Sequence, residues 1–130
     1  MKCSLVALTA VAGLSGGCNE TVRVTTQGGK PVLAAAKGMY AERSCEAWEP
    51  PEVSLSTPPQ HGKITHSLVR APLDLKGNVC HGKLIDYRVS IYTPERGFRG
   101  EDKFTIKYDM IVTDGGTRAT QSQDVVAEVK

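Results

Sequence analysis

The chain has 130 residues, the length of one domain, with 16 basic and 14 acidic side chains and a net charge of +2. A nucleic-acid or anionic-membrane partner calls for clustered positive charge, and this balance gives it no support. The hydrophobic share of 40% is enough for a packed core.

The first 17 residues have the pattern of a secretory signal peptide. Lys2 provides a positive start, residues 5–14 form an apolar run, and Ser15, Gly16 and Gly17 are small. The apolar run is too short to span a bilayer as a helix. We therefore expect residues 1–17 to be removed and the protein to be exported to the periplasm or the cell surface.

The four cysteines are Cys3, Cys18, Cys45 and Cys80, and Cys3 leaves with the signal peptide. Cys18 directly follows the small residues and resembles the lipid-accepting cysteine of a bacterial lipoprotein, although Ser15 stands where that motif has an aliphatic residue. Lipidation of Cys18, the one membrane contact expected, leaves Cys45 and Cys80 to pair in a disulfide. The alternative is conventional cleavage before Cys18, with that thiol free or bonded to another molecule.

The segment 19–51 has weaker patterns. Val22 and Val24 alternate with polar residues before Gly28 and Gly29, which predicts a short strand and a turn. Residues 31–37 fit either a strand or one helical turn. Residues 39–52 are expected to form a solvated loop, with a short acidic helix ended by two prolines as the alternative. We expect Trp48 to pack over the edge of the domain rather than to hold a ligand.

The middle of the chain alternates between strands and turns. Residues 52–56 predict a strand, residues 57–62 a proline-glycine turn, and residues 63–69 a second strand with Ile64 and Leu68 on one face. Residues 70–82, which contain Cys80, have the composition of a long irregular connection.

The strongest period-two alternation lies in residues 84–92 and 103–112. Ile85, Tyr87, Val89 and Ile91 alternate with polar residues in the first run, as do Phe104, Ile106, Tyr108, Met110 and Val112 in the second. Both runs predict half-buried strands with one wet face. The Asp-Gly-Gly run 114–116 predicts a hairpin to a last strand that contains Val125, Ala127 and Val129. The whole pattern predicts one all-β sandwich over residues 19–130.

Three motifs carry a family likeness over residues 52–130. The run PPQHGKI (58–64), the run YTPERGFRGEDKF (92–104) and the run DGG (114–116) together resemble bacterial immunoglobulin-like domains of the cadherin-like type. The resemblance implies an antiparallel immunoglobulin-like sandwich of about seven strands. Its fold-defining corner would be Tyr92, Pro94, Gly97, Phe98, Gly100, Asp102 and Phe104.

Turn chemistry accounts for most of this corner. Pro94 fixes a backbone angle, Gly97 and Gly100 accept conformations that a Cβ opposes, and Phe98 can fold onto the core. Asp102 is expected to cap amides of its own turn rather than to bind a metal.

The cysteines depart from the antibody pattern. Trp48 follows Cys45 by only three residues, and Cys80 lies in the 70–82 connection. A Cys45–Cys80 bond would therefore be a peripheral staple, with a stabilisation of roughly 3 to 4 kcal/mol on the chain-entropy model.

No catalytic or metal motif stands out. His61, His66 and His81 lack a ligand spacing, Cys80 and His81 are chain neighbours that point apart in an extended strand, and so are Glu101 and Asp102. We expect no enzyme activity, no metal and no cofactor.

The expected function is therefore binding. An exported immunoglobulin-like module would recognise another protein or a wall polymer through the 70–83 loop or the basic residues Arg96, Arg99 and Lys103. The alternatives are a structural building block of the adhesin type, against which a single copy argues, and a small hydrolase or inhibitor that uses residues 19–51.

Overall fold

The computed structural model describes residues 21–113 and 115–130, which form seven β-strands and no helix. The strands are β1 (Thr21–Thr26), β2 (Val32–Gly38), β3 (Glu52–Thr57), β4 (Gly62–Pro72), β5 (Leu84–Pro94), β6 (Gly100–Ile111) and β7 (Arg118–Val129). The described part thus contains no helix that could cross a membrane. The proposed signal peptide and Cys18 lie outside the described residues.

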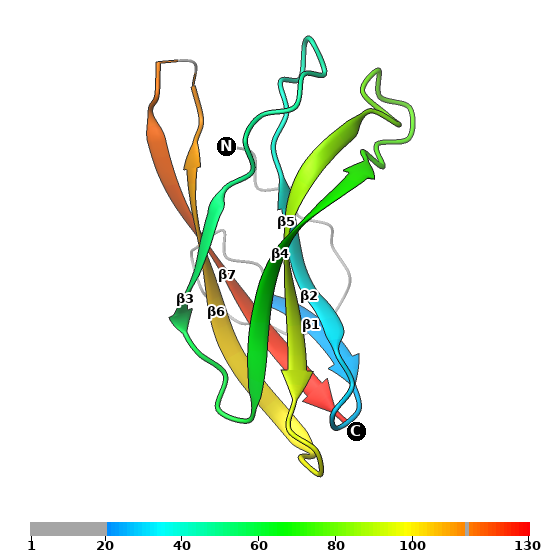
Figure 1. Cartoon of the computed structure of the whole chain (residues 1–130), viewed down its shortest axis with the longest axis vertical. Coiled ribbons are helices and arrows are strands. Elements are labelled where there is room, and N and C mark those ends of the chain that lie inside the picture. Colours follow the sequence, from blue (N-terminus) through cyan, green and yellow to red (C-terminus); the bar gives the residue numbers. More distant parts are fainter. Residues whose placement is uncertain (1–20, 114) are drawn as a thin grey trace, which may run out of the picture.

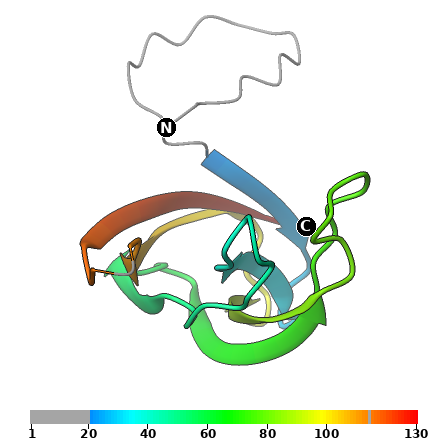
Figure 2. The ribbon, with the colours of Figure 1, turned by 90° about the horizontal axis from the view of Figure 1, so that it is seen from above.

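The strands make two sheets packed face to face (Figures 1 and 2). One sheet has the order β1-β7-β6-β3 and the other β2-β5-β4. Strands β2, β5 and β4 share one sheet, as strands B, E and D do in an immunoglobulin-like sandwich, and β3, β6 and β7 share the other, as strands C, F and G do. This arrangement confirms the predicted fold class. One pairing departs from the antiparallel expectation, because β1 runs parallel to β7, with Val22 opposite Val125.

The predicted elements lie close to the observed strands, and the structure decides between the alternatives that the sequence left open. Residues 32–38 are a strand and not a helical turn, and residues 39–51 form the expected loop and contain no helix. One difference is that β4, expected over residues 63–69, extends to Pro72. The irregular connection before β5 is therefore shorter than the expected 70–82. Pro72 is accepted because β4 is an edge strand, where a missing amide proton costs no ladder bond.

The main core lies between the sheets at the end where the corner is. Phe104, Ile106 and Tyr108 of β6 point inward, as the alternation predicted, and pack with Tyr92. The rings of Tyr92 and Phe104 stack with centroids 5.3 Å apart. Additional members of this core are Ala34, Val125, Ala127 and Val129.

The inward face of β5 is not the one that the alternation favoured. Tyr92 and Ser90 are fully buried toward the main core, whereas Ile85, five positions from Ser90, lies on the opposite face. Ile85 packs instead in a second, smaller core with Leu73 and Cys80. The prediction of one wet face is therefore wrong for β5, because the loops at one end cover its outer side.

Candidate binding site

The stapled loops, defined here as residues 39–51 and 73–83, lie together at the end of the molecule opposite the corner (Figure 1). The predicted disulfide is present: Cys45 and Cys80 are bonded, with their Cα atoms 5.2 Å apart. Cys45 has a φ of 59°, which is the left-handed region, and its amide donates to the Ala41 carbonyl at 2.8 Å. The bond thus joins the loop after β2 to the loop between β4 and β5.

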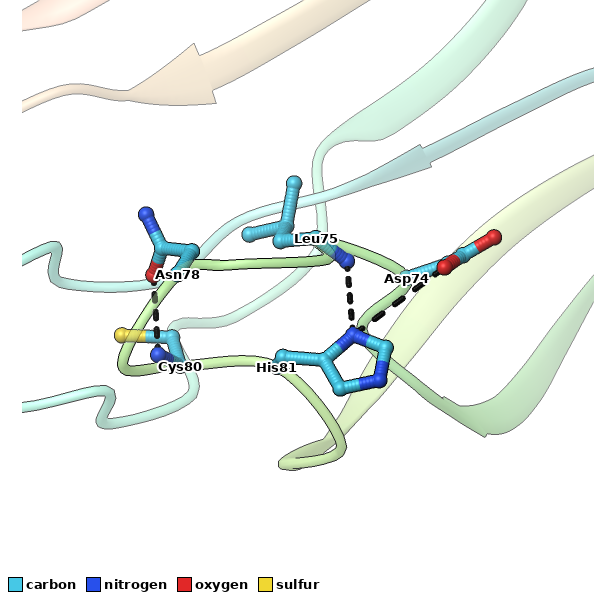
Figure 3. A network of polar contacts seen from close by, with 5 residues as sticks. All are labelled: Asp74, Leu75, Asn78, Cys80 and His81. Carbon is cyan, nitrogen blue, oxygen red and sulfur yellow. Dashed lines mark hydrogen bonds and ion pairs between the residues drawn. The ribbon is translucent and has the colours of Figure 1, made fainter.

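The second stapled loop is held by its own polar contacts (Figure 3). The Cys80 amide donates to Asn78 Oδ1 at 2.8 Å, and the Leu75 amide donates to His81 Nδ1 at 3.1 Å. Nδ1 is therefore the unprotonated nitrogen and has no proton for the Asp74 carboxylate 4.0 Å away. Two further backbone bonds close the base of the loop, between Leu73 and Lys83 and between Gly82 and Leu73.

The small core beneath the loops fixes their position. Leu73, Cys80 and Ile85 are buried there, and Tyr40 and Tyr87 pack against them. At the loop tip, by contrast, the Val79 side chain is 81% exposed. The stapled loops therefore present an apolar tip on a fixed base.

The corner is an internal joint rather than an open site. Asp102 is 2% exposed, and its carboxylate accepts the amide protons of Gln60 and His61, both at 2.9 Å, and the Tyr92 phenol proton at 2.8 Å. It also accepts from the Lys103 amide at 3.1 Å. The prediction that Asp102 caps amides of its own turn is therefore wrong in the main, because the carboxylate caps chiefly the turn that contains Gln60 and His61.

Other corner contacts complete this joint. The rings of His61 and Phe98 stack with centroids 4.2 Å apart, and the Gly29 amide donates to the Pro94 carbonyl at 3.1 Å. Gly97 and Gly100 both have positive φ, at 82° and 129°. Three turns are therefore fixed against one another at this end.

The three basic residues predicted as contacts stay at the surface. Arg96 and Arg99 lie in the turn between β5 and β6, and Lys103 points outward from β6. The structure leaves all three side chains exposed. Trp48, which was expected at the edge, is half-buried in the first stapled loop.

The histidines lie apart in the fold. His61 is in the corner, His81 is in a stapled loop, and His66 lies between the sheets with Nδ1 2.8 Å from Ser90 Oγ. Within the described ranges 21–113 and 115–130, no three His, Cys, Asp or Glu side chains form a possible metal site.

The sequence reasoning missed a polar region between the sheets at the stapled end. Lys37 and Arg88 are cross-strand partners on β2 and β5, and both project from the inward face. Lys37 Nζ donates to Gln121 Oε1 across the space between the sheets, and Arg88 Nε donates to the Pro51 carbonyl at 3.1 Å. The alternation in β5 had placed Arg88 and Ser90 together on one face, which is correct. That face was predicted to be the solvent-exposed one, whereas it is the inward one.

The sheets diverge in this region. In Figure 1 the β6–β7 hairpin and the β4–β5 hairpin separate toward the stapled end. Leu68 shares one face of β4 with Ile64, as predicted, but it is 56% exposed at this end, where the sheets diverge. A cleft of about 370 Å³ opens between β2 and the β6–β7 pair, with Lys37, Tyr108 and Gln121 in its wall.

Burial changes the acid-base properties of this region. It lowers the pKa of the Lys37 amine and raises the pKa of the Tyr108 phenol. The pKa of His66 is lowered by burial first and by the positive charge of Arg88 second.

Comparison with known proteins gives no relative, because no family model, no curated protein and no solved structure matches this chain.

Proposed function

We propose that this chain is a non-enzymatic binding module of the bacterial cell envelope, which recognises another protein or an envelope polymer through the stapled loops. The observation that carries the proposal is the exposed Val79 tip on a base fixed by the Cys45–Cys80 bond. A loop that is already ordered loses little conformational entropy on binding. An apolar side chain at its tip gives the kind of anchor that interfaces bury.

The corner motifs and the export pattern support the same proposal. The likeness of residues 58–64 and 92–104 to cadherin-like bacterial domains suggests a surface role. The disulfide fits an oxidising compartment. Removal of residues 1–17 would leave Cys18 as the first residue. Lipidation of Cys18 would then anchor the module to a membrane.

Arg96, Arg99 and Lys103 form the second candidate contact region. Their side chains are exposed at or beside the corner, while Tyr92 and Asp102 use their polar groups within the fold. This region is at the opposite end from Val79, so one experiment can separate the two.

Site-specific photocrosslinking in the native host tests the proposal. A photoreactive residue replaces Val79 in one strain and Arg96 in a matched strain, with equal protein levels. We expect a discrete crosslinked partner from Val79, lost when Cys45 and Cys80 are both replaced by alanine. Crosslinks from position 96 alone would move the site to the corner, and crosslinks only to the chain itself would favour the structural building block.

Labelling with palmitate tests the anchor separately. The native chain is expected to incorporate the label, and the Cys18→Ala chain is not. An unlabelled native chain would contradict lipidation and favour conventional cleavage.

A further inference from the structure

The inward-facing polar groups at the stapled end include two cations. Lys37 and Arg88 face each other directly across the β2–β5 ladder. Like charges in this arrangement repel. Within residues 21–113 and 115–130, the ion pairs present involve neither of them.

The cleft beside Lys37 has no acid in its wall. Its lining combines the aliphatic side chains of Val22, Ala34, Ala35 and Ala36 with the polar side chains of Lys37, Tyr108, Gln121 and Gln123. The acids Glu49, Glu52 and Asp109 lie instead along a separate cleft of about 180 Å³, which Arg88 lines. The charge of the first cleft is therefore positive, and its remaining lining is apolar or neutral.

Tyr108 gives an independent indication of a missing partner. Its side chain is 3% exposed, yet its hydroxyl finds no hydrogen-bond partner in the described part of the chain. Leaving a buried hydroxyl unpaired costs about 1 to 3 kcal/mol. A tyrosine phenol is protonated at neutral pH, so it is available as a donor.

We propose that this inter-sheet cleft binds a small organic acid, whose carboxylate pairs with Lys37 and whose short aliphatic part lies along Ala34, Ala35 and Val22, with the Tyr108 hydroxyl as a further donor. A carboxylate supplies the negative charge that Lys37 does not receive from its neutral partner Gln121, and an acceptor oxygen for the Tyr108 hydroxyl. The cleft volume of about 370 Å³ is comparable to that of small-molecule sites. This site uses none of the stapled-loop residues and does not depend on the proposed partner.

Titration of the full chain with hexanoate, followed by NMR of the backbone amides of residues 34–37, tests this proposal. We expect saturable shifts with hexanoate and none with hexan-1-ol at equal ionic strength. Lys37→Met keeps the aliphatic stem and removes the charge, and it is expected to weaken binding roughly tenfold or more. Lys30→Met, at an exposed lysine in a turn, is the matched control and is expected to bind as the native chain does.

Two further variants are tested by their thermal midpoint of unfolding as well as by hexanoate binding. Tyr108→Phe is expected to weaken hexanoate binding without lowering the thermal midpoint, because it removes a hydroxyl that has no partner. Gln121→Glu places a carboxylate beside Lys37 and is expected to block hexanoate and to raise the midpoint. The proposal would be overturned if the amide shifts of the native chain did not saturate with hexanoate. It would also be overturned if Lys37→Met or Gln121→Glu bound hexanoate as tightly as the native chain does.

Discussion

Tyr92 and Asp102 are joined by a buried hydrogen bond of 2.8 Å in which the phenol donates to the carboxylate. Tyr92 lies on the inward face of β5 and Asp102 on the inward face of β6, so this bond links the two sheets at the corner. The same carboxylate accepts the Gln60 and His61 amide protons. The corner is thus organised around one acceptor group.

Replacing that acceptor is expected to be costly. Asp102→Ala leaves two backbone amides and a phenol without their acceptor, and we expect a loss of about 3 kcal/mol or more in the free energy of unfolding. Tyr92→Phe removes one donor and is expected to cost about 1 kcal/mol. Urea denaturation at neutral pH measures both. Glu101→Ala, which loses only an exposed contact with Arg23, is the control, and an equal cost there would contradict the role of Asp102.

The disulfide gives a second stability prediction. Replacing Cys45 and Cys80 together by alanine removes the constraint on 35 residues of unfolded chain. We expect a loss of roughly 3 to 4 kcal/mol, seen as a lower urea midpoint. Reduction of the native chain should lower its midpoint to a similar value, while the double variant should not respond to reductant. A native midpoint unaffected by complete reduction would contradict the prediction.

Acidification is expected to destabilise the fold through His66. Burial and Arg88 hold the pKa of His66 below its ordinary value of 6.5. As pH falls below that value the unfolded chain takes up a proton before the folded chain does, so the free energy of unfolding decreases. Above it both states are neutral and the contribution vanishes.

The His66→Gln variant isolates this effect. Its free energy of unfolding should depend less on pH than that of the native chain in the region below 6.5. NMR titration of the His66 ring in the folded chain measures the pKa directly. A folded-state pKa above the ordinary value would reverse the sign and refute the argument.

Gly62 is expected to tolerate no side chain. A Cβ at this position would lie 2.5 Å from Tyr92 Cε2 and 2.7 Å from the Thr93 carbonyl oxygen. Because one of these atoms is backbone, relief requires the β4–β5 pair to move. We expect Gly62→Ala to cost about 1 to 3 kcal/mol in urea denaturation. At Gly115 the nearest atom would be 3.7 Å away, so Gly115→Ala should cost clearly less.

The strands could be predicted from the sequence because the residues that determine each strand and its turns lie close together in the chain. Alternation located β6 and its inward residues, and prolines and glycines located the turns on either side. The cysteine count also led to the correct disulfide. These features depend on residues close together in the chain or on a pairing with few alternatives.

What the sequence did not predict depends on contacts between distant segments. In β5 both faces carry apolar residues, and only the position of the stapled loops decides that Ile85 faces them while Tyr92 faces the other sheet. The acceptor role of Asp102 toward Gln60 requires two turns 42 positions apart to meet. The Lys37–Arg88 pair was hidden for the same reason, because cross-strand register is not visible in either strand alone.

The position of the disulfide also determines how the fold would carry a mechanical load. Cys45 follows β2, and Cys80 lies between β4 and β5, so the bond clamps the ends of all three strands of one sheet. A pull on the Val79 tip is then shared by these strands along their axes, and the β2–β5 ladder is not sheared strand against strand. Without the bond the same pull would act on the β4–β5 hairpin alone.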